Sequence, residues 1–563
     1  MNLATANRFR TSALSAAMLA TSSLMANASA AAAEEFYGTT EPFASEAIYF
    51  VLTDRFVNGD TTNDHRDQGG KNRTFDVPTP GAPAGETDNI GYLGGDFKGI
   101  VDNAAYIRDM GFTSVWVTPI VDNPDEAFTG GDAAKWGGMF TDRGKTGFHG
   151  YWGINFYKLD EHLPSAGLDF AGFTQAMKQQ KLDVVLDIVG NHGSPAYSMP
   201  KMQPQYGKVY DRDGKLVADH QNLNPDRLDP AHNRLHAFYN TGGGLAQLSD
   251  FNQDNPAVLE YLVGAYEQWI DQGAAAFRVD TIAWMPHSFW KKFADRIRAK
   301  RPGFFMFGEA FNYDAAIIAG HTLDRNGHYS VLDFPMRGKM AATFEKKGAD
   351  FAELATSLYL EDGPYANPYD LVTFYDNHDM ARINASDEGF IDANNWLFTA
   401  RGIPAVYYGS ETGFMRGRAE HMGNRNYYGQ ERVDAAAKSP IYPALKRIAN
   451  LRRESSALQR GLQFNVRMKG DEAVFYRVYQ HEGANQTALV LLNKGDAART
   501  VSVSDYLQAG SWRDAFSGKR IKVGKQLRLE VPAHGVRVLF FDQPLTRKDL
   551  RAKLADSMAR KDR

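Results

Sequence analysis

Eight short runs rich in β-branched and aromatic residues recur along the chain, and stretches with helical periodicity separate most of them. This alternation indicates a parallel sheet, because consecutive parallel strands need a crossover connection, usually a helix. Eight such units predict an α/β fold of the (β/α)8 or TIM-barrel type with insertions. The predicted strands are residues 48–56, 114–119, 183–189, 275–280, 304–310, 329–334, 371–376 and 405–409. The predicted helices are residues 97–111, 169–181, 256–271, 287–300 and 394–401.

The segments outside this pattern predict further parts of the chain. Residues 192–250, after the third strand, are rich in Gly, Pro, Asn and Asp, and a connection of that length is typical of an inserted loop domain. The barrel then comprises residues 34–191 and 251–455. Alternating strand patterns over residues 456–541 predict a C-terminal antiparallel β-sandwich. Residues 542–563 mix basic and acidic side chains, which indicates a solvated helix or a frayed charged tail.

Residues 1–33 have the pattern of a secretory signal peptide, with Arg8 and Arg10, then an apolar stretch, then a small-residue site at residues 28–30. We therefore expect a secreted protein, periplasmic or extracellular. No other stretch is apolar enough to predict a membrane span, so no membrane partner is expected. The chain has no Cys, which excludes disulfides and thiol catalysis. A net charge of -4 argues against a nucleic-acid partner, and we expect a monomer.

Polar and charged residues stand at the ends of four predicted strands. A barrel collects the carboxyl ends of its strands on one face, where its active site lies. Each residue alone has an ordinary explanation, since an acid after a strand often caps a helix and Asn-His pairs are common in turns. Together they form a charge cluster that stability does not require, which favours catalysis. These residues are Asp187, Asn191, His192, Arg278, Asp280, Glu309, Asn377, His378 and Asp379.

Two of these carboxyl groups have surroundings that predict different protonation states. Arg278 precedes Asp280 by two positions on one strand, so both face the same side and the cation favours ionised Asp280. Glu309 follows the apolar run FFMFG, where desolvation raises its pKa. Glycoside hydrolysis needs one ionised and one protonated carboxyl group beside the scissile bond. The pattern therefore favours a glycosidase.

At these positions the sequence resembles the α-amylase family of retaining glycoside hydrolases. The segments DIVGNH, FRVD, GEA and FYDNHD are similar to the family's four core motifs, in the same order, and the resemblance covers roughly residues 45–541. It implies Asp280 as nucleophile and Glu309 as general acid/base. It also implies Asp379 as the acid that stabilises the distorted, oxocarbenium-like sugar.

The same resemblance implies which residues bind substrate, an α-1,4-linked glucan or maltooligosaccharide. His192 and His378 would hydrogen-bond sugar hydroxyl groups, and Asp187 is similar to the buried acid that organises this cluster. Arg278, which faces the same side as Asp280, is counted with these residues. Tyr151, in the segment FHGYW, is similar to an aromatic residue on which that sugar stacks. Its flat ring suits the C–H face of a sugar, and the alternative is ordinary core packing.

Oxygen-rich segments predict Ca²⁺ as a cofactor. Four amide and carboxylate side chains fall within seven residues, a density of hard oxygen ligands that suits Ca²⁺, although a solvated turn is the alternative. These are Asn58, Asp60, Asn63 and Asp64. The segment is similar to the N-terminal calcium loop of cyclodextrin glucanotransferases, which implies further ligands at Gly94 and Asp96. The resemblance also implies a second calcium, at Asn191 and Asp250.

The sequence departs from the family on the side of the site that holds the acceptor. Glucanotransferases and many amylases carry a Lys-His pair just after the nucleophile's motif, where this chain has Ala283 and Trp284. Ala246 aligns with the central aromatic residue around which glucanotransferases curl a cyclising chain. Phe311 is similar to an acceptor-side aromatic residue associated with transfer. These departures weigh against cyclisation, and Trp284 and Phe311 are candidate substrate-binding residues.

Three functions remain open from the sequence. The first is hydrolysis of α-1,4-glucosidic bonds in starch-like glucans by a retaining double displacement. The second is an α-glucanotransferase or cyclomaltodextrinase on the same scaffold. The third, a noncatalytic sugar-binding protein, is disfavoured because such a protein does not need the mutually repelling carboxylates Asp280, Glu309 and Asp379. A net hydrolase is therefore the prediction.

Overall fold

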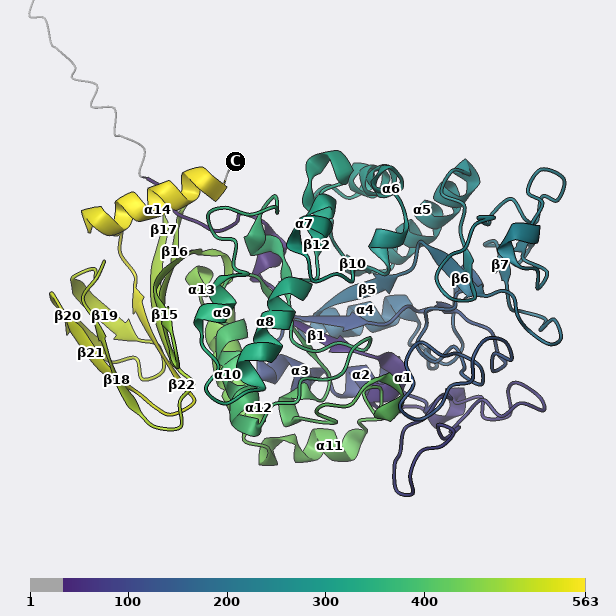
Figure 1. Cartoon of the computed structure of the whole chain (residues 1–563), viewed down its shortest axis with the longest axis horizontal. Coiled ribbons are helices and arrows are strands. Elements are labelled where there is room, and N and C mark those ends of the chain that lie inside the picture. The colour runs from purple at the N-terminus through teal and green to yellow at the C-terminus, as the bar shows by residue number, and fades with distance from the viewer. Residues whose placement is uncertain (1–33, 562–563) are drawn as a thin grey trace, which may run out of the picture. The chain divides into compact units, whose positions relative to one another are not determined.

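A sheet of eight parallel strands lies at the centre of this computed structural model, which describes residues 34–561 (Figure 1). The predicted signal peptide, residues 1–33, lies outside the described residues. A parallel bridge between Leu332 and Val372 joins the two edge strands and closes the barrel, so the predicted fold is confirmed. In sheet order the strands are β12 (Ser330–Val331), β11 (Phe305–Gly308), β10 (Ala274–Val279), β5 (Asp183–Ile188), β2 (Ser114–Val117), β1 (Ile48–Val51), β14 (Ile403–Tyr407) and β13 (Val372–Thr373).

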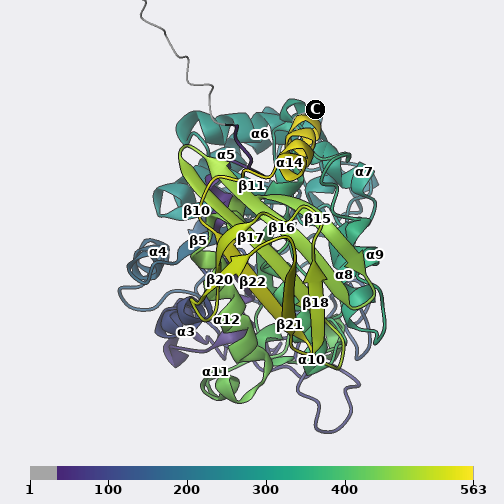
Figure 2. The same ribbon diagram turned by 90° about the vertical axis from the view of Figure 1, so that its left-hand side faces the viewer.

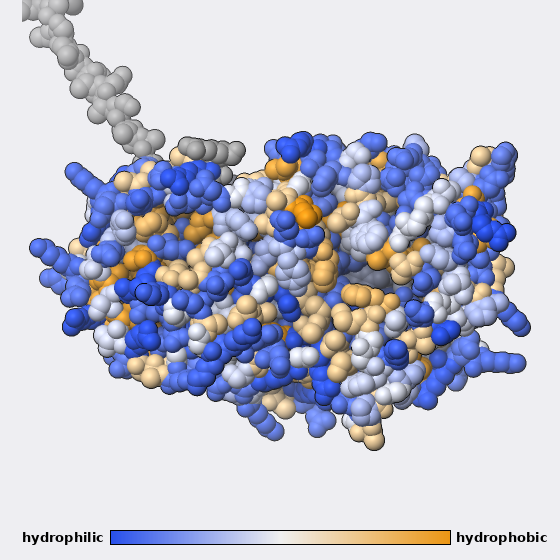
Figure 3. Space-filling view, viewed as in Figure 1, coloured by the Kyte–Doolittle hydropathy of each residue, from blue (hydrophilic) through white to orange (hydrophobic). Residues whose placement is uncertain are grey.

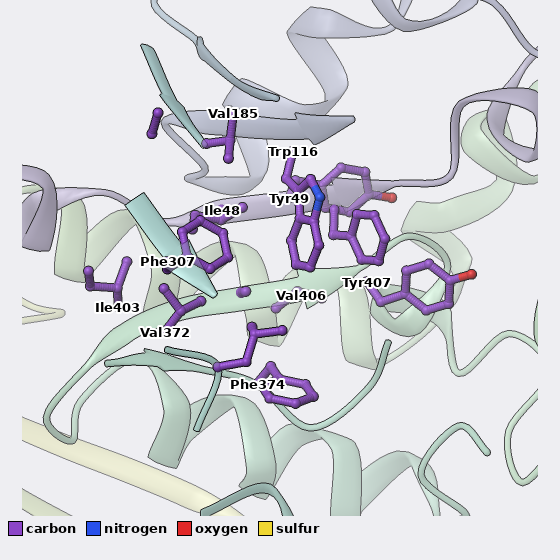
Figure 4. Packing of buried hydrophobic residues seen from close by; sticks show 14 of the residues in the cluster. Ile48, Tyr49, Trp116, Val185, Phe307, Val372, Phe374, Ile403, Val406 and Tyr407 are labelled. Carbon is purple, nitrogen blue, oxygen red and sulfur yellow. The ribbon is translucent and has the colours of Figure 1, made fainter. Parts of the chain in front are cut away.

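The barrel core consists of aromatic and aliphatic side chains from these strands (Figure 4). Phe50 and Trp116 stack with ring centroids 3.8 Å apart, and the Phe307 ring meets Trp116 edge-on. Nearly every strand residue is buried because helices cover the outer face of a parallel sheet. The larger covering helices are α4 (Phe170–Gln179), α5 (Pro256–Asp271), α6 (His287–Lys300), α8 (Phe334–Phe344), α10 (Asp387–Leu397) and α12 (Ile441–Arg453).

Two helix predictions differ from the structure in their bounds. The segment predicted as one helix over residues 97–111 forms α2 (Phe97–Asp102) and α3 (Ala104–Met110). Asn103 separates them, because its backbone N–H bonds back to α2 while its side-chain amide donates to the Gly99 carbonyl. The helix predicted at 394–401 begins earlier as α10, since Ser386 caps it. Smaller helices are α1 (Thr53–Phe56), α7 (Ala315–Ile318), α9 (Ala352–Ala355) and α11 (Gln430–Ala435).

The connection over residues 192–250 forms two short antiparallel ribbons. Strand β6 (His192–Pro195) pairs with β9 (Leu248–Asp250), and β7 (Lys208–Tyr210) pairs with β8 (Leu216–Asp219). The first ribbon joins the beginning of the connection to its end, and it places His192 opposite Asp250. A second connection, between β2 and β5, contains the ribbon of β3 (Val121–Asp122) and β4 (Asn155–Leu159). Both connections follow carboxyl ends of barrel strands and so extend over the face where a site is expected.

The C-terminal part is antiparallel, as predicted, and faces the viewer in Figure 2. After α13 (Ser456–Arg460), one sheet of six strands packs with a ribbon of two. The six strands, in sheet order, are β15 (Leu462–Lys469), β16 (Glu472–His481), β17 (Ala484–Asn493), β22 (Gly535–Phe541), β19 (Gly510–Asp514) and β20 (Arg520–Val523). The ribbon pairs β18 (Arg499–Val503) with β21 (Leu527–Val531).

The charged tail is a helix that packs on this sandwich. Helix α14 (Lys548–Lys561) contacts β15, and Leu550 and Leu554 are fully buried in the sandwich core (Figures 1 and 2). The predicted helix is therefore present, but it is neither frayed nor fully solvated, because two leucines four positions apart give one face of the helix an apolar contact. Within residues 34–561 no helix combines the length and apolar character needed to cross a membrane.

Candidate active site

Arg278 joins three of the predicted carboxyl groups. Its side chain leaves β10 toward the barrel interior, where it is fully buried. Nη1 lies 2.8 Å from Asp187 Oδ1 and 2.8 Å from Asp280 Oδ1, and Nη2 lies 2.9 Å from Glu309 Oε2. These acids come from the ends of β5, β10 and β11, which are neighbours in the sheet. One guanidinium therefore holds both candidate catalytic carboxyl groups, Asp280 and Glu309, next to each other.

Asp187 accepts hydrogen bonds from several sides and does not reach solvent. Trp116 Nε1 donates to its Oδ2 at 3.0 Å, and the Tyr151 hydroxyl donates to the same atom at 2.8 Å. Burial raises the pKa of Asp187 to about 7, although Arg278 opposes the shift. Asp187 thus fixes the orientation of Tyr151 and Arg278, and its role as the acid that organises the site stays a prediction.

Glu309 and Asp379 have pKa values shifted in opposite directions. Burial raises the pKa of Glu309 well above its usual range, and the neighbouring Asp379 and Asp280 add to this, against Arg278. Burial also opposes ionisation of Asp379, but His378 and Arg425 outweigh it and lower its pKa. The two side chains are close enough to share a hydrogen bond. They therefore share a proton that resides on Glu309, the state that a general acid requires.

The two predicted histidines are buried and neutral. Burial lowers the pKa of His378 to about 3, and its Nε2 lies 3.1 Å from Asp379 Oδ2. The His378 ring stacks on Tyr151 with centroids 5.2 Å apart. Burial also lowers the pKa of His192. A neutral imidazole can donate one hydrogen bond and accept another, which suits contact with hydroxyl groups.

These side chains surround a cavity of about 430 Å³. The surface of this face is hollowed to the right of its centre, near the carboxyl ends of the barrel strands (Figure 3). Asp187 and Arg278 are buried and do not line the cavity, so they act on the lining residues. The predicted residues that line it are Tyr151, His192, Ala246, Asp280, Trp284, Glu309, Phe311, His378 and Asp379. Trp284 and Phe311 are about half exposed, so their rings are open to a ligand.

Several charged residues at the cavity were not predicted from the sequence. Glu420 Oε1 lies 2.9 Å from Lys145 Nζ and 3.0 Å from Arg425 Nη1, and Arg425 Nη2 lies 2.8 Å from Asp379 Oδ1. Lys145 also pairs with Asp142 at 2.9 Å. Lys145 belongs to the connection between β2 and β5, and Glu420 and Arg425 to the connection after β14. The sequence does indicate these residues by their position, because charged residues in long connections after barrel strands are candidates for an active site on the carboxyl face of the barrel.

The residues of the predicted N-terminal calcium loop lie together. Gly94 has φ +87°, and a Cβ atom there would lie 2.3 Å from Asn58 Nδ2 and 2.4 Å from Asp64 Oδ1, so only glycine fits. The side-chain oxygens of Asn58 and Asn63 are buried without a hydrogen-bond partner. Buried oxygens left open beside a carboxylate fit a hard cation such as Ca²⁺.

The remaining predicted ligands of this loop are already engaged by hydrogen bonds. Asp96 Oδ1 accepts the N–H groups of Gly59 and Gly99, and Oδ2 accepts the Asp60 N–H and the Asn63 amide. Asp60 Oδ1 accepts the hydroxyl and N–H of Thr62. In this geometry Asp96 shapes the loop backbone, and the oxygens open to a cation are those of Asn58 and Asn63.

The second predicted calcium site brings Asn191 and Asp250 together. The Asn191 side chain hydrogen-bonds Asp250, and Asn240 Nδ2 donates to Asp250 Oδ2 at 2.8 Å. Among the described residues, a different acidic group has the spacing for a metal, made of Asp122, Asp160 and Glu161. Lys158 pairs with Asp122 of that group at 2.8 Å, so part of its charge is already neutralised.

The fold and the site define a class of protein. The site combines a carboxyl group paired with a buried arginine, a second carboxyl group whose pKa is raised, and neutral hydrogen-bonding side chains at the carboxyl face of a (β/α)8 barrel. These side chains suit a reaction that transfers a glycosyl group from the oxygen of the scissile bond to the oxygen of an acceptor. The family description "Alpha amylase, catalytic domain" matches residues 50–441. The chain therefore belongs to the α-amylase family.

Two relatives of this chain in sequence are cyclomaltodextrin glucanotransferases. The chain is 29% identical to a cyclomaltodextrin glucanotransferase of Klebsiella oxytoca, covering 88% of this chain and 77% of the relative. It is 28% identical to that of Thermoanaerobacterium thermosulfurigenes, over 84% of this chain and 64% of the relative. The chain thus spans about two thirds to three quarters of the length of these two relatives.

Solved structures similar to this chain include both a glucanotransferase and an α-amylase. A cyclomaltodextrin glucanotransferase with a three-domain ABC distribution is 28% identical, with a TM-score of 0.71, covering 89% of this chain and 99% of that one. An α-amylase from Geobacillus thermoleovorans, complexed with acarbose, is 26% identical, with a TM-score of 0.66, covering 88% of this chain and 98% of that one. These comparisons support the recognised family and leave hydrolysis and transfer both open.

Proposed function

We propose that this chain is a secreted, calcium-binding enzyme that hydrolyses α-1,4-glucosidic bonds of starch-like glucans and maltooligosaccharides with retention of configuration. The observation that carries the proposal is the placement of Asp280 and Glu309 on the single guanidinium of Arg278. Retaining hydrolysis requires two such carboxyl groups close together, one of them protonated.

In this proposal Asp280 attacks the anomeric carbon while Glu309 gives its proton to the leaving oxygen. The bond to the leaving sugar breaks as the ester to Asp280 forms. Glu309, now ionised, then takes a proton from water, and the resulting hydroxide displaces Asp280 to give an α-anomeric product. Asp379, ionised beside Arg425, stabilises the positive charge that develops on the sugar ring. Tyr151 offers the sugar a stacking face.

Asn58 and Asn63 would hold the proposed Ca²⁺ with their open side-chain oxygens, and Asp64, which accepts the Asn58 amide N–H at 2.7 Å, would orient Asn58. A bound cation supplies a fixed positive charge that ties the loop of residues 58–64 to Gly94 and so stabilises the fold. No chemical step is assigned to it. Secretion is proposed from the pattern of residues 1–33.

The experiment is hydrolysis of maltoheptaose followed by NMR at early times. An initial α-anomeric product is expected, and Asp280→Asn and Glu309→Gln should each lower kcat by at least about a thousandfold while circular dichroism stays unchanged. An initial β-anomer, or full activity in either variant, contradicts the proposal.

A second candidate function is glycosyl transfer, including opening of cyclodextrins. The Klebsiella and Thermoanaerobacterium relatives are named as glucanotransferases, and Phe311 lines the cavity with its ring half exposed. The two candidates share the covalent intermediate and differ in whether water or a sugar hydroxyl displaces Asp280.

A further inference from the structure

A cavity of about 700 Å³ lies between the barrel and the C-terminal sandwich, and it shares no lining residue with the catalytic cavity. Its walls come from the loop after α8, the first half of α10, and the turns before β16, after β17 and before β22. Helix α10 contacts β17 and β22, and these elements lie side by side in Figure 1. The cavity therefore opens part of the junction between barrel and sandwich to water.

His534, in the turn before β22, bridges this junction through both nitrogens of its ring. Nδ1 lies 2.7 Å from Asp392 Oδ2 on helix α10, and Nε2 lies 3.3 Å from Asp496 Oδ1 in the turn after β17. Asp392 is buried, whereas His534 lines the cavity and is partly exposed. One imidazole ring therefore joins a buried acid of the barrel to an acid of the sandwich, where protons can reach it from solvent.

The backbone of the sandwich fixes the position of this ring. His534 has a φ of +48°, in the left-handed region that residues other than glycine rarely adopt. Its N–H donates to the Gly495 carbonyl at 3.3 Å, which ties the turn before β22 to the turn after β17. Such a conformation persists only where the surrounding structure holds it. The sandwich therefore presents His534 to α10 in one orientation.

The two contacts of the ring need one proton more than a neutral histidine carries. Each ring nitrogen faces a carboxylate oxygen, so each contact requires a hydrogen between nitrogen and oxygen. A neutral imidazole has one N–H, and the second proton must reside on the ring or on a carboxyl group such as that of Asp392. Without that proton the lone pair of one nitrogen faces a carboxylate, and the two repel each other.

The surroundings favour retention of this second proton near neutral pH. Burial raises the pKa of Asp392 to about 7, although His534 opposes the shift. Burial lowers the pKa of His534, but its hydrogen bonds to Asp392 and Asp496 outweigh burial, and the pKa is raised. Both shifts are upward, so the closed junction holds more protons than an open, solvated one does.

The other charged groups at this cavity are lysines and acids that largely pair with one another. Lys347 pairs with Asp496, and Lys494 Nζ lies 2.8 Å from Asp471 Oδ1. Both lysines thus pair with acids other than Asp392. The remaining charged residues that line the cavity are Glu345, Lys346 and Glu388.

We propose that Asp392, His534 and Asp496 form a proton-operated latch that holds the sandwich against α10 at mildly acidic and neutral pH and releases it as pH rises. The bridging proton stabilises the closed junction fully below about pH 6.5, the ordinary pKa of a solvated histidine. This stabilisation is lost as pH rises through the higher pKa of the closed pair. The latch concerns the junction between the domains, so it does not depend on the proposed function.

The test is hydrogen exchange of the α10 amides from pH 6 to 9, corrected for intrinsic exchange rates and compared with the amides of α4. One linked proton changes the population of the open junction by at most about tenfold per pH unit. In the wild type, protection of α10 relative to α4 should therefore fall about tenfold or more over this range. In His534→Gln, which has no titrating ring, it should stay nearly constant and close to the wild-type value at pH 9.

His232→Gln is the matched control, because exposed His232 pairs with Asp229 through Nδ1 alone, and it should keep the wild-type pH dependence. Asp496→Asn is the second variant. Its amide can donate to the unprotonated nitrogen, so protection of α10 should stay high at pH 9. The Asp496 side chain is 59% exposed, so this change removes no core packing.

Two results overturn the latch. One is the same pH dependence of α10 protection in the wild type and in His534→Gln. The other is a wild-type pH dependence in Asp496→Asn, which decides the question by itself if a melting curve at pH 6 shows that His534→Gln does not fold.

Discussion

Arg278 Nη1 lies 2.8 Å from Asp280 Oδ1 on the same face of strand β10, in a region without solvent access to the guanidinium. The same side chain contacts Asp187 and Glu309. One cation therefore contacts three buried acidic side chains, and its removal affects both the fold and the reaction.

We expect Arg278→Met to lower the free energy of unfolding by about 3–5 kcal/mol, because buried carboxylates lose their counter-charge. Arg301→Met is the matched control, since Arg301 pairs with Asp271 on the surface and its loss should change stability by no more than about 0.5 kcal/mol. Urea unfolding measures both. Equal losses in the two variants contradict the compensating role of Arg278.

The pH dependence of the reaction follows from the opposite shifts of two carboxyl groups. Glu309 has a raised pKa and acts while protonated, so kcat/KM should fall as pH rises through that value. Asp379 has a lowered pKa and acts while ionised, so kcat/KM should fall as pH drops through its value. Arg425→Met removes the cation 2.8 Å from Asp379, and the acidic limb should then move to higher pH.

The profile is measured with maltoheptaose, and Arg425→Lys serves as the control because it keeps a positive charge at this position. An acidic limb that stays in place in Arg425→Met shows that Asp379 does not govern it. Because Glu309 and Asp379 share a proton, the apparent pKa values read from the two limbs of the pH profile belong to the pair and not to either residue alone.

Removal of calcium should lower the melting temperature. A ligand bound only by the folded state at a hundredfold excess over its Kd stabilises that state by about 2.7 kcal/mol, which EDTA removes. Asp64→Ala should shrink the difference between melting curves with and without EDTA, because Asp64 Oδ1 accepts the Asn58 amide N–H at 2.7 Å and so fixes the direction of the open Asn58 oxygen. Asp102→Ala, an exposed acid on α2, is the control. Identical wild-type curves with and without EDTA contradict the calcium proposal.

The packing of α14 predicts that the charged tail contributes to stability. Leu554 is fully buried against the sandwich, so Leu554→Ala should lower the free energy of unfolding by about 2–5 kcal/mol. Lys553 is exposed on the same helix, and Lys553→Ala should change little. Urea unfolding of both variants is the measurement. If the two variants unfold alike, the helix does not stabilise the sandwich.

The barrel strands and the core of the site could be predicted because local sequence determines them. A run such as FFMFG is buried on both faces, and an acid at its end must reach the carboxyl face of the barrel. The contact between Lys145 and Glu420 joins residues 275 positions apart, and no local pattern indicates it. The docking of α14 was missed for a related reason, since its two buried leucines stand among many charged residues.

The fate of the glycosyl intermediate depends on the acceptor side of the cavity, where water and a sugar compete for the ester to Asp280. Ala283 is exposed and lacks the charged donor that a lysine would offer a sugar hydroxyl, which favours water. Trp284 and Phe311 present half-exposed rings that favour a sugar acceptor. Ala246 lines the cavity with a methyl group in place of an aromatic ring, so a long chain has no central surface around which to curl.

We therefore expect net hydrolysis of amylose to short maltooligosaccharides, with linear transfer at high substrate concentration and little cyclodextrin. Ala283→Lys should raise the ratio of transfer products to new reducing ends, because it restores a charged hydrogen-bond donor to the acceptor. Chromatography of early products, with and without added glucose as acceptor, measures this ratio, and Lys553→Ala serves as a remote control. If cyclodextrins or transfer products outnumber new reducing ends in the wild type at low substrate, the chain is a transferase, and the stacking rings outweigh the missing lysine.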